Sequence, residues 1–270
     1  MNARDIIDHH MHTNASPDAK TDATFERYID AATKRKLPAL MFTDHVDMDT
    51  PVALFQTYPD YTAYKETLRT LAKTTSIDLR MGVEVGLQPH LKSRLDAFTA
   101  AHPFDVVIGS IHLGDGLDFY NGDFFQGKTQ KEAYRRYFEI ALALIQTQDC
   151  FDIFGHFDYI IRYGNYEDKQ FETADYDDLI LPALDMLARK GKALEINTSG
   201  FRYGLGVTHP KRDILRRFKA LGGQYVTLGS DAHDVSDLQD YFEQALTLLK
   251  ETGFKAVTTY KDRQPLLHRI

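Results

Sequence analysis

Histidines and aspartates recur along this chain in pairs whose spacing suits metal binding. His10 and His12 flank one residue, and Asp231 and His233 do the same near the other end of the sequence. Because side chains two apart on a β-strand point to the same side, both members of each pair can reach one ion. Imidazole nitrogens mixed with carboxylate oxygens suit zinc, manganese or iron(II) better than calcium. The pairs therefore predict a transition-metal site.

The elements that position these residues are expected to alternate between strand and helix. Short apolar runs rich in β-branched residues predict strands near residues 5–12, 39–45, 79–86, 105–113, 151–157, 193–199 and 225–233. Helical periodicity predicts helices near residues 22–36, 60–75, 90–101, 129–147, 175–190, 209–221 and 236–252. Parallel strands need crossover connections, which are usually helices, so this order predicts a parallel sheet with helices outside it. Seven such units favour closure into an α/β barrel over an open sheet.

Nearly every expected strand ends in a residue that can bind a metal, and Glu84 on the third could bridge two ions. A lone histidine at a strand end is more often an ordinary core or surface residue. In parallel α/β folds, however, the C-terminal strand ends converge on one functional face. The histidines at these ends are His10, His12, His45, His112, His156 and His233. The histidines elsewhere, which we interpret as ordinary residues, are His9, His90, His102, His209 and His268.

Taken in order, these motifs resemble those of the polymerase and histidinol phosphatase superfamily, usually called the PHP family. The matching residues are His10-x-His12, Asp44-His45, Glu84, Ser110-Ile111-His112, Gly155-His156 and Ser230-Asp231-Ala232-His233. The resemblance covers the whole chain. It implies an α/β fold of the distorted (βα)7 barrel kind, TIM-like, in a single domain spanning residues 1–270, with three divalent transition-metal ions bound.

The resemblance also implies which residues hold each ion. One ion takes His10, His12, Glu84 and Asp231, a second takes Glu84, His112 and His156, and a third takes His45, His233 and Asp18. Asp18 is chosen because the loop after the first strand reads Ser16-Pro17-Asp18, where many members of the family carry a histidine or cysteine. Glu84, Asp231 and His233 are expected to be catalytic. The ligand types accept zinc, manganese and iron alike, so they leave the metal open.

Within this family the chain is most similar to the histidinol-phosphate phosphatase branch, which implies metal-dependent hydrolysis of L-histidinol phosphate to L-histidinol and phosphate. Arg162 lies where that branch carries a basic residue, and a guanidinium suits bidentate contact with phosphate. Asn197 and Ser199, which follow Glu195 at two-residue spacing, are further candidates for binding substrate. The irregular stretches 114–128 and 158–174 follow ligand strands and are candidate substrate loops.

The motifs are also compatible with other activities. The enzyme could act on another small phosphate ester, such as a nucleotide, or be a metal-dependent amidohydrolase, whose barrel also begins with His-x-His. Amidohydrolases often carry a bridging carboxylated lysine, whereas Glu84 occupies that role here. A further alternative is a haloacid-dehalogenase-type phosphatase, whose Asp-x-Asp-x-Thr motif is similar to Asp47-Met48-Asp49-Thr50, although Thr50 follows Asp49 directly. That motif belongs directly at a strand end, so we interpret Asp47 and Asp49 as parts of a surface turn.

Composition restricts the partners and the location. A formal net charge of −7 disfavours a protein that binds nucleic acid through a broad basic face, so a small phosphate monoester is the expected partner. No run of residues is apolar and long enough to cross a bilayer, and no signal-like stretch opens the chain. The single cysteine, Cys150, cannot form an internal disulfide. A cytoplasmic protein without membrane contact is expected, and its oligomeric state stays open.

Overall fold

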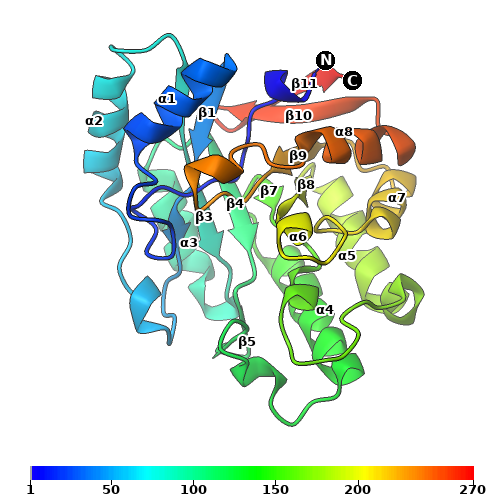
Figure 1. Cartoon of the computed structure of the whole chain (residues 1–270). Helices are drawn as coiled ribbons and strands as arrows, with labels where there is room; N and C mark the ends of the chain where they lie inside the picture. Colours follow the sequence, from blue (N-terminus) through cyan, green and yellow to red (C-terminus); the bar gives the residue numbers. More distant parts are fainter. Residues whose placement is uncertain (1) are drawn as a thin grey trace.

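The structure is a computed structural model that describes residues 2–270. Its main sheet is parallel throughout, in the order β1-β3-β4-β7-β8-β9, with β2 also paired to β3 (Figure 1). The strands are β1 (Ala39–Phe42), β2 (His45–Val46), β3 (Asp78–Gly86), β4 (Val106–Ser110), β7 (Ile153–Phe154), β8 (Ala193–Asn197) and β9 (Val226–Gly229). The parallel α/β architecture expected from the alternation is therefore confirmed.

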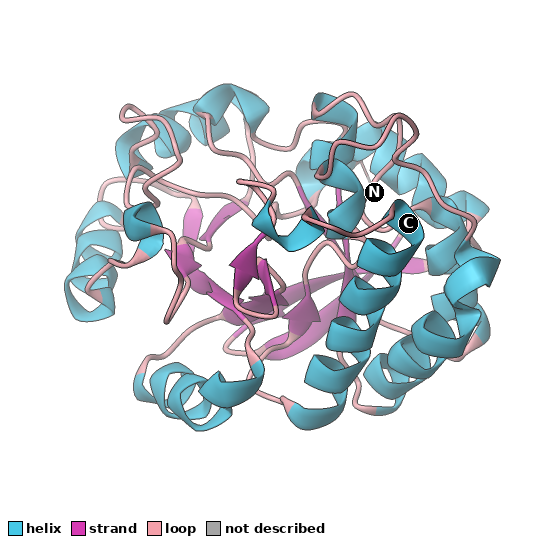
Figure 2. Cartoon of the chain, turned by 90° about the horizontal axis from the view of Figure 1, so that it is seen from below, coloured by secondary structure: helices cyan, strands magenta, loops and turns pink. Residues whose placement is uncertain are grey.

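Helices surround the strands on the outside, as the view from below shows (Figure 2). They are α1 (Phe25–Arg35), α2 (Tyr61–Leu71), α3 (Lys92–Ala101), α4 (Gln130–Thr147), α5 (Asp177–Arg189), α6 (Ser199–Arg202), α7 (Arg212–Ala220) and α8 (Phe242–Glu251). Side chains cap the N-termini of several helices. At the start of α4 the Thr129 hydroxyl accepts from the backbone N–H of Glu132, and the Glu132 carboxylate accepts from the backbone N–H of Thr129, which forms a capping box. The expected helix 236–252 begins only at Phe242, because Gln239 and Tyr241 take left-handed backbone conformations.

The first expected strand, 5–12, is not a regular strand. Residues 3–5 form a 3₁₀ turn, and only Met11 makes a β-bridge, to Ala232. The reason is Asp8, whose buried carboxylate accepts the backbone N–H groups of His10 and Ser230 in place of a continuous ladder. The segment still joins the two edges of the curled sheet. It is hydrogen-bonded to β9 through His9 N and Leu228 O, and to the end of β1 through Thr43 N and Met11 O.

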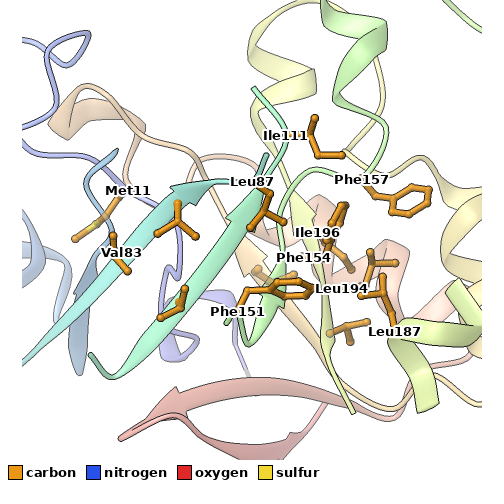
Figure 3. Close-up of a cluster of buried hydrophobic side chains, with 14 of the residues drawn as sticks. Met11, Val83, Leu87, Ile111, Phe151, Phe154, Phe157, Leu187, Leu194 and Ile196 are labelled. Atoms are coloured by element: carbon orange, nitrogen blue, oxygen red, sulfur yellow. The ribbon is translucent and has the colours of Figure 1, made fainter. Parts of the chain in front are cut away.

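Alternation along the strands separates two apolar layers. Residues such as Val83, Leu194 and Ile196 face outward into the core shared with the helices (Figure 3). The neighbouring residues Glu84 and Glu195 therefore face into the barrel. A smaller cluster fills one end of the barrel interior and consists of Ile7, Ala39, Met41, Val106, Ile108, Ile153, Ala193 and Tyr260.

Two antiparallel hairpins, which the sequence did not predict, lie at the two ends of the parallel sheet. β10 (Ala256–Lys261) and β11 (Gln264–Arg269) pair at the C-terminus, and Tyr260 of β10 packs into the barrel interior. β5 (Leu113–Gly114) and β6 (Leu117–Asp118) form a short hairpin at the opposite end of the sheet (Figure 1). The C-terminal strand ends thus open away from β10. Within residues 2–270, no helix combines the length and apolar character that crossing a membrane would require.

Candidate metal centre

Glu84 lies at the middle of the histidine cluster and is fully buried. Its position on β3 between the outward-facing Val83 and Val85 turns the carboxylate into the barrel. Its oxygens lie 3.2 Å from His10 Nε2, 2.8 Å from His45 Nδ1, 3.2 Å from His112 Nε2, 3.0 Å from His156 Nε2 and 3.6 Å from His12 Nε2. One carboxylate therefore touches five of the six histidines that the sequence places at strand ends.

Asp231 forms the second centre of contacts. Its Oδ1 lies 3.5 Å from His12 Nε2, 3.7 Å from His10 Nε2 and 3.6 Å from His233 Nδ1. The backbone of Asp231 is left-handed, with φ of 54°, so β9 stops before it and its side chain turns toward the cluster. The Arg202 guanidinium donates to the carbonyl oxygens of Ser230 and Asp231 and holds this turn.

Asp18 completes the cluster from the loop after the first segment. Its Oδ2 lies 3.0 Å from His233 Nε2 and 3.6 Å from His45 Nε2. The loop is fixed on both sides, because Lys20 N donates to His233 O and the Ser16 hydroxyl donates to the buried Asp44 carboxylate. The structure therefore brings Asp18 to the same two histidines that the sequence grouped with it.

Several buried nitrogen and oxygen atoms in this cluster lie close to one another but form no hydrogen bond of acceptable geometry with residues 2–270. A buried polar atom without a partner is costly unless something else satisfies it. These atoms are His10 Nε2, His12 Nε2, His45 Nδ1, Glu84 Oε2 and His233 Nε2. Four sets of ligand atoms each lie within 4.8 Å of one another: His12-His45-His233, His10-His12-Asp231, His10-Glu84-His156 and His45-Glu84-His112. Nitrogen and carboxylate donors at this spacing fit divalent transition-metal ions.

The charges in the cluster favour ionised carboxylates. Burial alone raises the pKa of the Glu84 carboxyl, but His10, His112 and His45 hold that pKa well below its usual range. Burial also opposes ionisation of Asp231, yet His10, a hydrogen bond from His12 and the Arg162 guanidinium keep its pKa well below the usual value. Burial and the neighbouring His45 and His233 lower the pKa of His12, which keeps its imidazole neutral, the form that binds metals.

A cavity of about 340 Å³ opens above the cluster, with Glu84, Asp231 and His233 among its lining residues. His10 and His12 are fully buried beneath it. Both candidate substrate loops reach the cavity, since Tyr120 from one and Tyr163 from the other line its wall. The functional face is thus a pocket whose base carries metal-competent atoms and whose wall is largely aromatic.

Arg162 lies on the cavity wall, at the end of the 3₁₀-helix Tyr159–Arg162. Its guanidinium carbon is 3.4 Å from the centre of the Tyr203 ring, and its Nη1 lies 3.6 Å from Asp231 Oδ2. The side chain is only 14% exposed. The stacking and the ion pair hold the guanidinium beside the cluster, where it can face a bound anion.

Asn197 and Ser199 lie elsewhere than expected. β8 ends at Asn197, and Ser199 begins helix α6 instead of continuing the strand. Both are fully buried and neither lines the cavity. Asn197 donates to Glu195, and its side-chain oxygen accepts from both the backbone N–H and the hydroxyl of Ser199. The geometry therefore does not support direct substrate contact, and it gives the two residues a role in the turn from β8 into α6.

Two carboxylates that orient candidate ligands were missed in the sequence. Glu195 Oε1 lies 2.7 Å from His10 Nδ1, and its position two residues before Asn197 on an expected strand was the available signal. Asp47 Oδ1 lies 2.8 Å from His112 Nδ1. The interpretation of Asp47 as part of a surface turn is wrong, because the chain pairs again with β3 at β2 and buries this carboxylate against Gly86. Asp49 is at the surface, paired with Arg94.

A parallel α/β barrel with histidines and carboxylates gathered at the C-terminal strand ends defines a metal-dependent hydrolase class. The sequence matches the PHP domain over residues 8–199, so this chain belongs to the PHP domain family. It is 33% identical to the histidinol-phosphatase of Lactococcus lactis over 94% of both chains. It is 31% identical to a probable histidinol-phosphatase of Clostridium acetobutylicum, over 93% of this chain and 96% of that one.

The fold of this chain is also similar to those of solved histidinol phosphatase structures. The fold is similar to that of histidinol phosphate phosphatase from Lactococcus lactis, solved in complex with zinc, L-histidinol and phosphate, with a TM-score of 0.88 and 31% identity. That similarity covers 97% of this chain and 98% of the other. A putative histidinol phosphatase from Listeria monocytogenes shares the fold, with a TM-score of 0.75 at 18% identity over 88% of this chain and 99% of that one.

Proposed function

We propose that this chain is a histidinol-phosphate phosphatase, which hydrolyses L-histidinol phosphate to L-histidinol and phosphate with the help of divalent metals. The observation that carries the proposal is the cavity, in which metal-competent atoms of Glu84, Asp231 and His233 form the base and Arg162 stands on the wall. The similarity along nearly the whole length to a histidinol-phosphatase supports the same activity. So does the structural similarity to an enzyme complexed with zinc, L-histidinol and phosphate.

We further propose that the cluster holds three ions, with Glu84 shared between two of them. Glu84 occurs in two of the four geometric sets, as a ligand shared between two ions would, and the set His10-His12-Asp231 coincides with three proposed ligands of the first ion. Zinc, manganese and iron all fit the donor atoms. The proposed ligands are His10, His12, Asp18, His45, Glu84, His112, His156, Asp231 and His233.

The residues of the chain itself supply positioning. When bound, divalent ions contribute positive charge for the phosphate oxygens and lower the pKa of bound water toward neutrality. Glu84 and Asp231, both ionised, keep the base of the cavity from becoming too positive to release phosphate. The Arg162 guanidinium, fixed against Tyr203, can donate two parallel hydrogen bonds to phosphate oxygens. The aromatic wall formed by residues such as Phe119, Tyr120 and Tyr163 limits access of bulk water.

The cavity weakens the alternative activities. No lysine lines it among residues 2–270, whereas a carboxylated lysine is frequent in amidohydrolases. The Asp-x-Asp-x-Thr alternative also lacks support: Asp49 lies outside the cavity and is paired with Arg94, and Asp47 is turned toward His112. A phosphatase acting on a different small ester remains the alternative to test.

The substrate assignment is tested by measuring phosphate release from a panel of esters. The panel contains histidinol phosphate, nucleoside monophosphates, sugar phosphates and an aryl phosphate. We expect the highest kcat/KM for histidinol phosphate, because the cavity is small, its wall is largely aromatic and both candidate substrate loops line it. Slow turnover of histidinol phosphate beside fast turnover of another ester would overturn the assignment. Hydrolysis of cyclic amides without any phosphate release would favour the amidohydrolase alternative.

We further propose that the partner is a small phosphate monoester, with neither nucleic acid nor membrane involved. We also propose a catalytic role for Glu84, Asp231 and His233, a single domain spanning residues 1–270 and a cytoplasmic location.

A further inference from the structure

We propose that Glu195 is a positioning residue of the metal centre, which selects the nitrogen that His10 presents and fixes the backbone that carries His156. Glu195 comes from β8, is fully buried and does not line the cavity. It belongs to none of the sets of mutually close ligand atoms. Its influence must therefore pass through the residues that it touches.

The first contact sets the tautomer of His10. Glu195 Oε1 lies 2.7 Å from His10 Nδ1, so the carboxylate requires a proton on Nδ1. The lone pair of the neutral ring is then on Nε2, the atom that lies 3.2 Å from Glu84 and 3.7 Å from Asp231 and has no hydrogen-bond partner. A carboxylate behind a metal-binding histidine acts in this way in many metal sites.

The second contact holds a strained backbone. Glu195 Oε2 accepts the backbone N–H of His156 at 2.7 Å. His156 has a φ of 23°, which a residue with a side chain rarely adopts without support from its surroundings. This conformation brings His156 Nε2 to 3.0 Å from Glu84. One carboxylate thus fixes two candidate ligands from separate segments, His156 after β7, which pairs with β8, and His10 from the segment beside β9.

Two glycines leave room for the Glu195 carboxylate. A Cβ atom at Gly229 would lie 2.2 Å from Glu195 Oε1 and 2.6 Å from His10 Cβ. A Cβ at Gly155 would lie 2.4 Å from the Ser110 hydroxyl and 3.5 Å from Glu195 Oε2. Glycine at position 229 is therefore required for the close approach of Glu195 to His10.

The variant Glu195→Gln should reverse the tautomer without removing the side chain. The amide oxygen can still accept from the His156 N–H and from Asn197 Nδ2, which leaves the amino group facing His10 Nδ1. His10 would then accept at Nδ1 and carry its proton on Nε2, where it blocks metal binding. We expect the zinc dissociation constant, measured by competition with a chromophoric chelator, to rise by about tenfold or more.

A merely structural role would lower stability but leave zinc binding unchanged. Glu195 is fully buried and pairs with His10 at 2.7 Å, so its replacement should lower the thermal midpoint of the metal-free protein in either case, and zinc affinity is the measurement that separates the two roles. Unchanged zinc affinity with a lowered midpoint would overturn the proposal. If the glutamine variant fails to fold, Glu195→Asp serves instead, because its carboxylate is withdrawn from His10 by one methylene and zinc binding should again weaken.

Asp158→Asn is the matched control. Asp158 is also a fully buried carboxylate beside a histidine, with Oδ1 2.9 Å from His209 Nδ1, but His209 lies outside the four ligand sets. Zinc affinity should stay at the wild-type value in this variant, and an equal loss in both variants would contradict the specific role of Glu195. The inference rests on the proposed metal centre, yet chelator competition uses no substrate. If the protein failed to hydrolyse histidinol phosphate, the zinc measurement would still test the role of Glu195. If the wild-type protein bound no zinc, both the metal centre and the role of Glu195 would be contradicted.

Discussion

Replacing Glu84 with glutamine should remove most of the bound metal and lower kcat/KM for histidinol phosphate by about 10³-fold, or about 4 kcal/mol. The carboxylate touches His10, His12, His45, His112 and His156, so no other side chain joins as many candidate ligands. Glutamine keeps the volume but loses the charge and one acceptor oxygen. Elemental analysis of the purified variant, together with steady-state kinetics, measures both effects.

The matched control is Glu66→Gln, the same change on the exposed face of α2, where Arg69 is the ionic partner of Glu66 among the residues that the structure describes. An exposed pair of this kind contributes little to stability, so metal content and kinetics should remain those of the wild type. A Glu84→Gln protein that kept full metal content and full activity would refute the cluster. Retained metal with lost activity would instead restrict Glu84 to a role in the reaction.

The centre of this site could be predicted because its signals are local. Alternation between Val83, Glu84 and Val85 is enough to place one carboxylate inside a barrel whose strands are parallel. The convergence of His112 and His156 follows from the same rule, since both come just after strands. No knowledge of distant contacts was needed for these residues.

The parts that could not be predicted depend on distant contacts. Asp8 interrupts the first strand because it accepts from Ser230, which is far away in the sequence. Asp47 is drawn inward by His112, and the sequence alone made it a residue of a surface turn. Ser199 has the spacing of a strand residue, but the bond from its backbone N–H to Asn197 begins a helix there. In each case a side chain satisfies a backbone or imidazole group that the local pattern leaves free.

Replacing Arg162 with alanine should lower kcat/KM for histidinol phosphate by about 2 kcal/mol, roughly 30-fold, while the metal content stays unchanged. The guanidinium is held beside Asp231 and over Tyr203, so it reaches an anion in the cavity without further ordering. Among residues 2–270 it pairs with one candidate ligand, Asp231, which is why loss of metal is not expected. Steady-state kinetics with elemental analysis separates the two effects.

Arg162→Lys distinguishes charge from shape at the same position. Lysine keeps the positive charge but cannot stack as a plane on Tyr203 or donate two parallel hydrogen bonds, so its kcat/KM should fall between those of the wild type and the alanine variant. Arg135→Ala is the surface control, because Arg135 pairs with the acidic residues Glu139 and Asp178 on the helical exterior. If alanine at position 162 left the kinetics unchanged, Arg162 would be a structural partner of Asp231 and Tyr203. The phosphate would then depend on the metal centre alone for its positive charge.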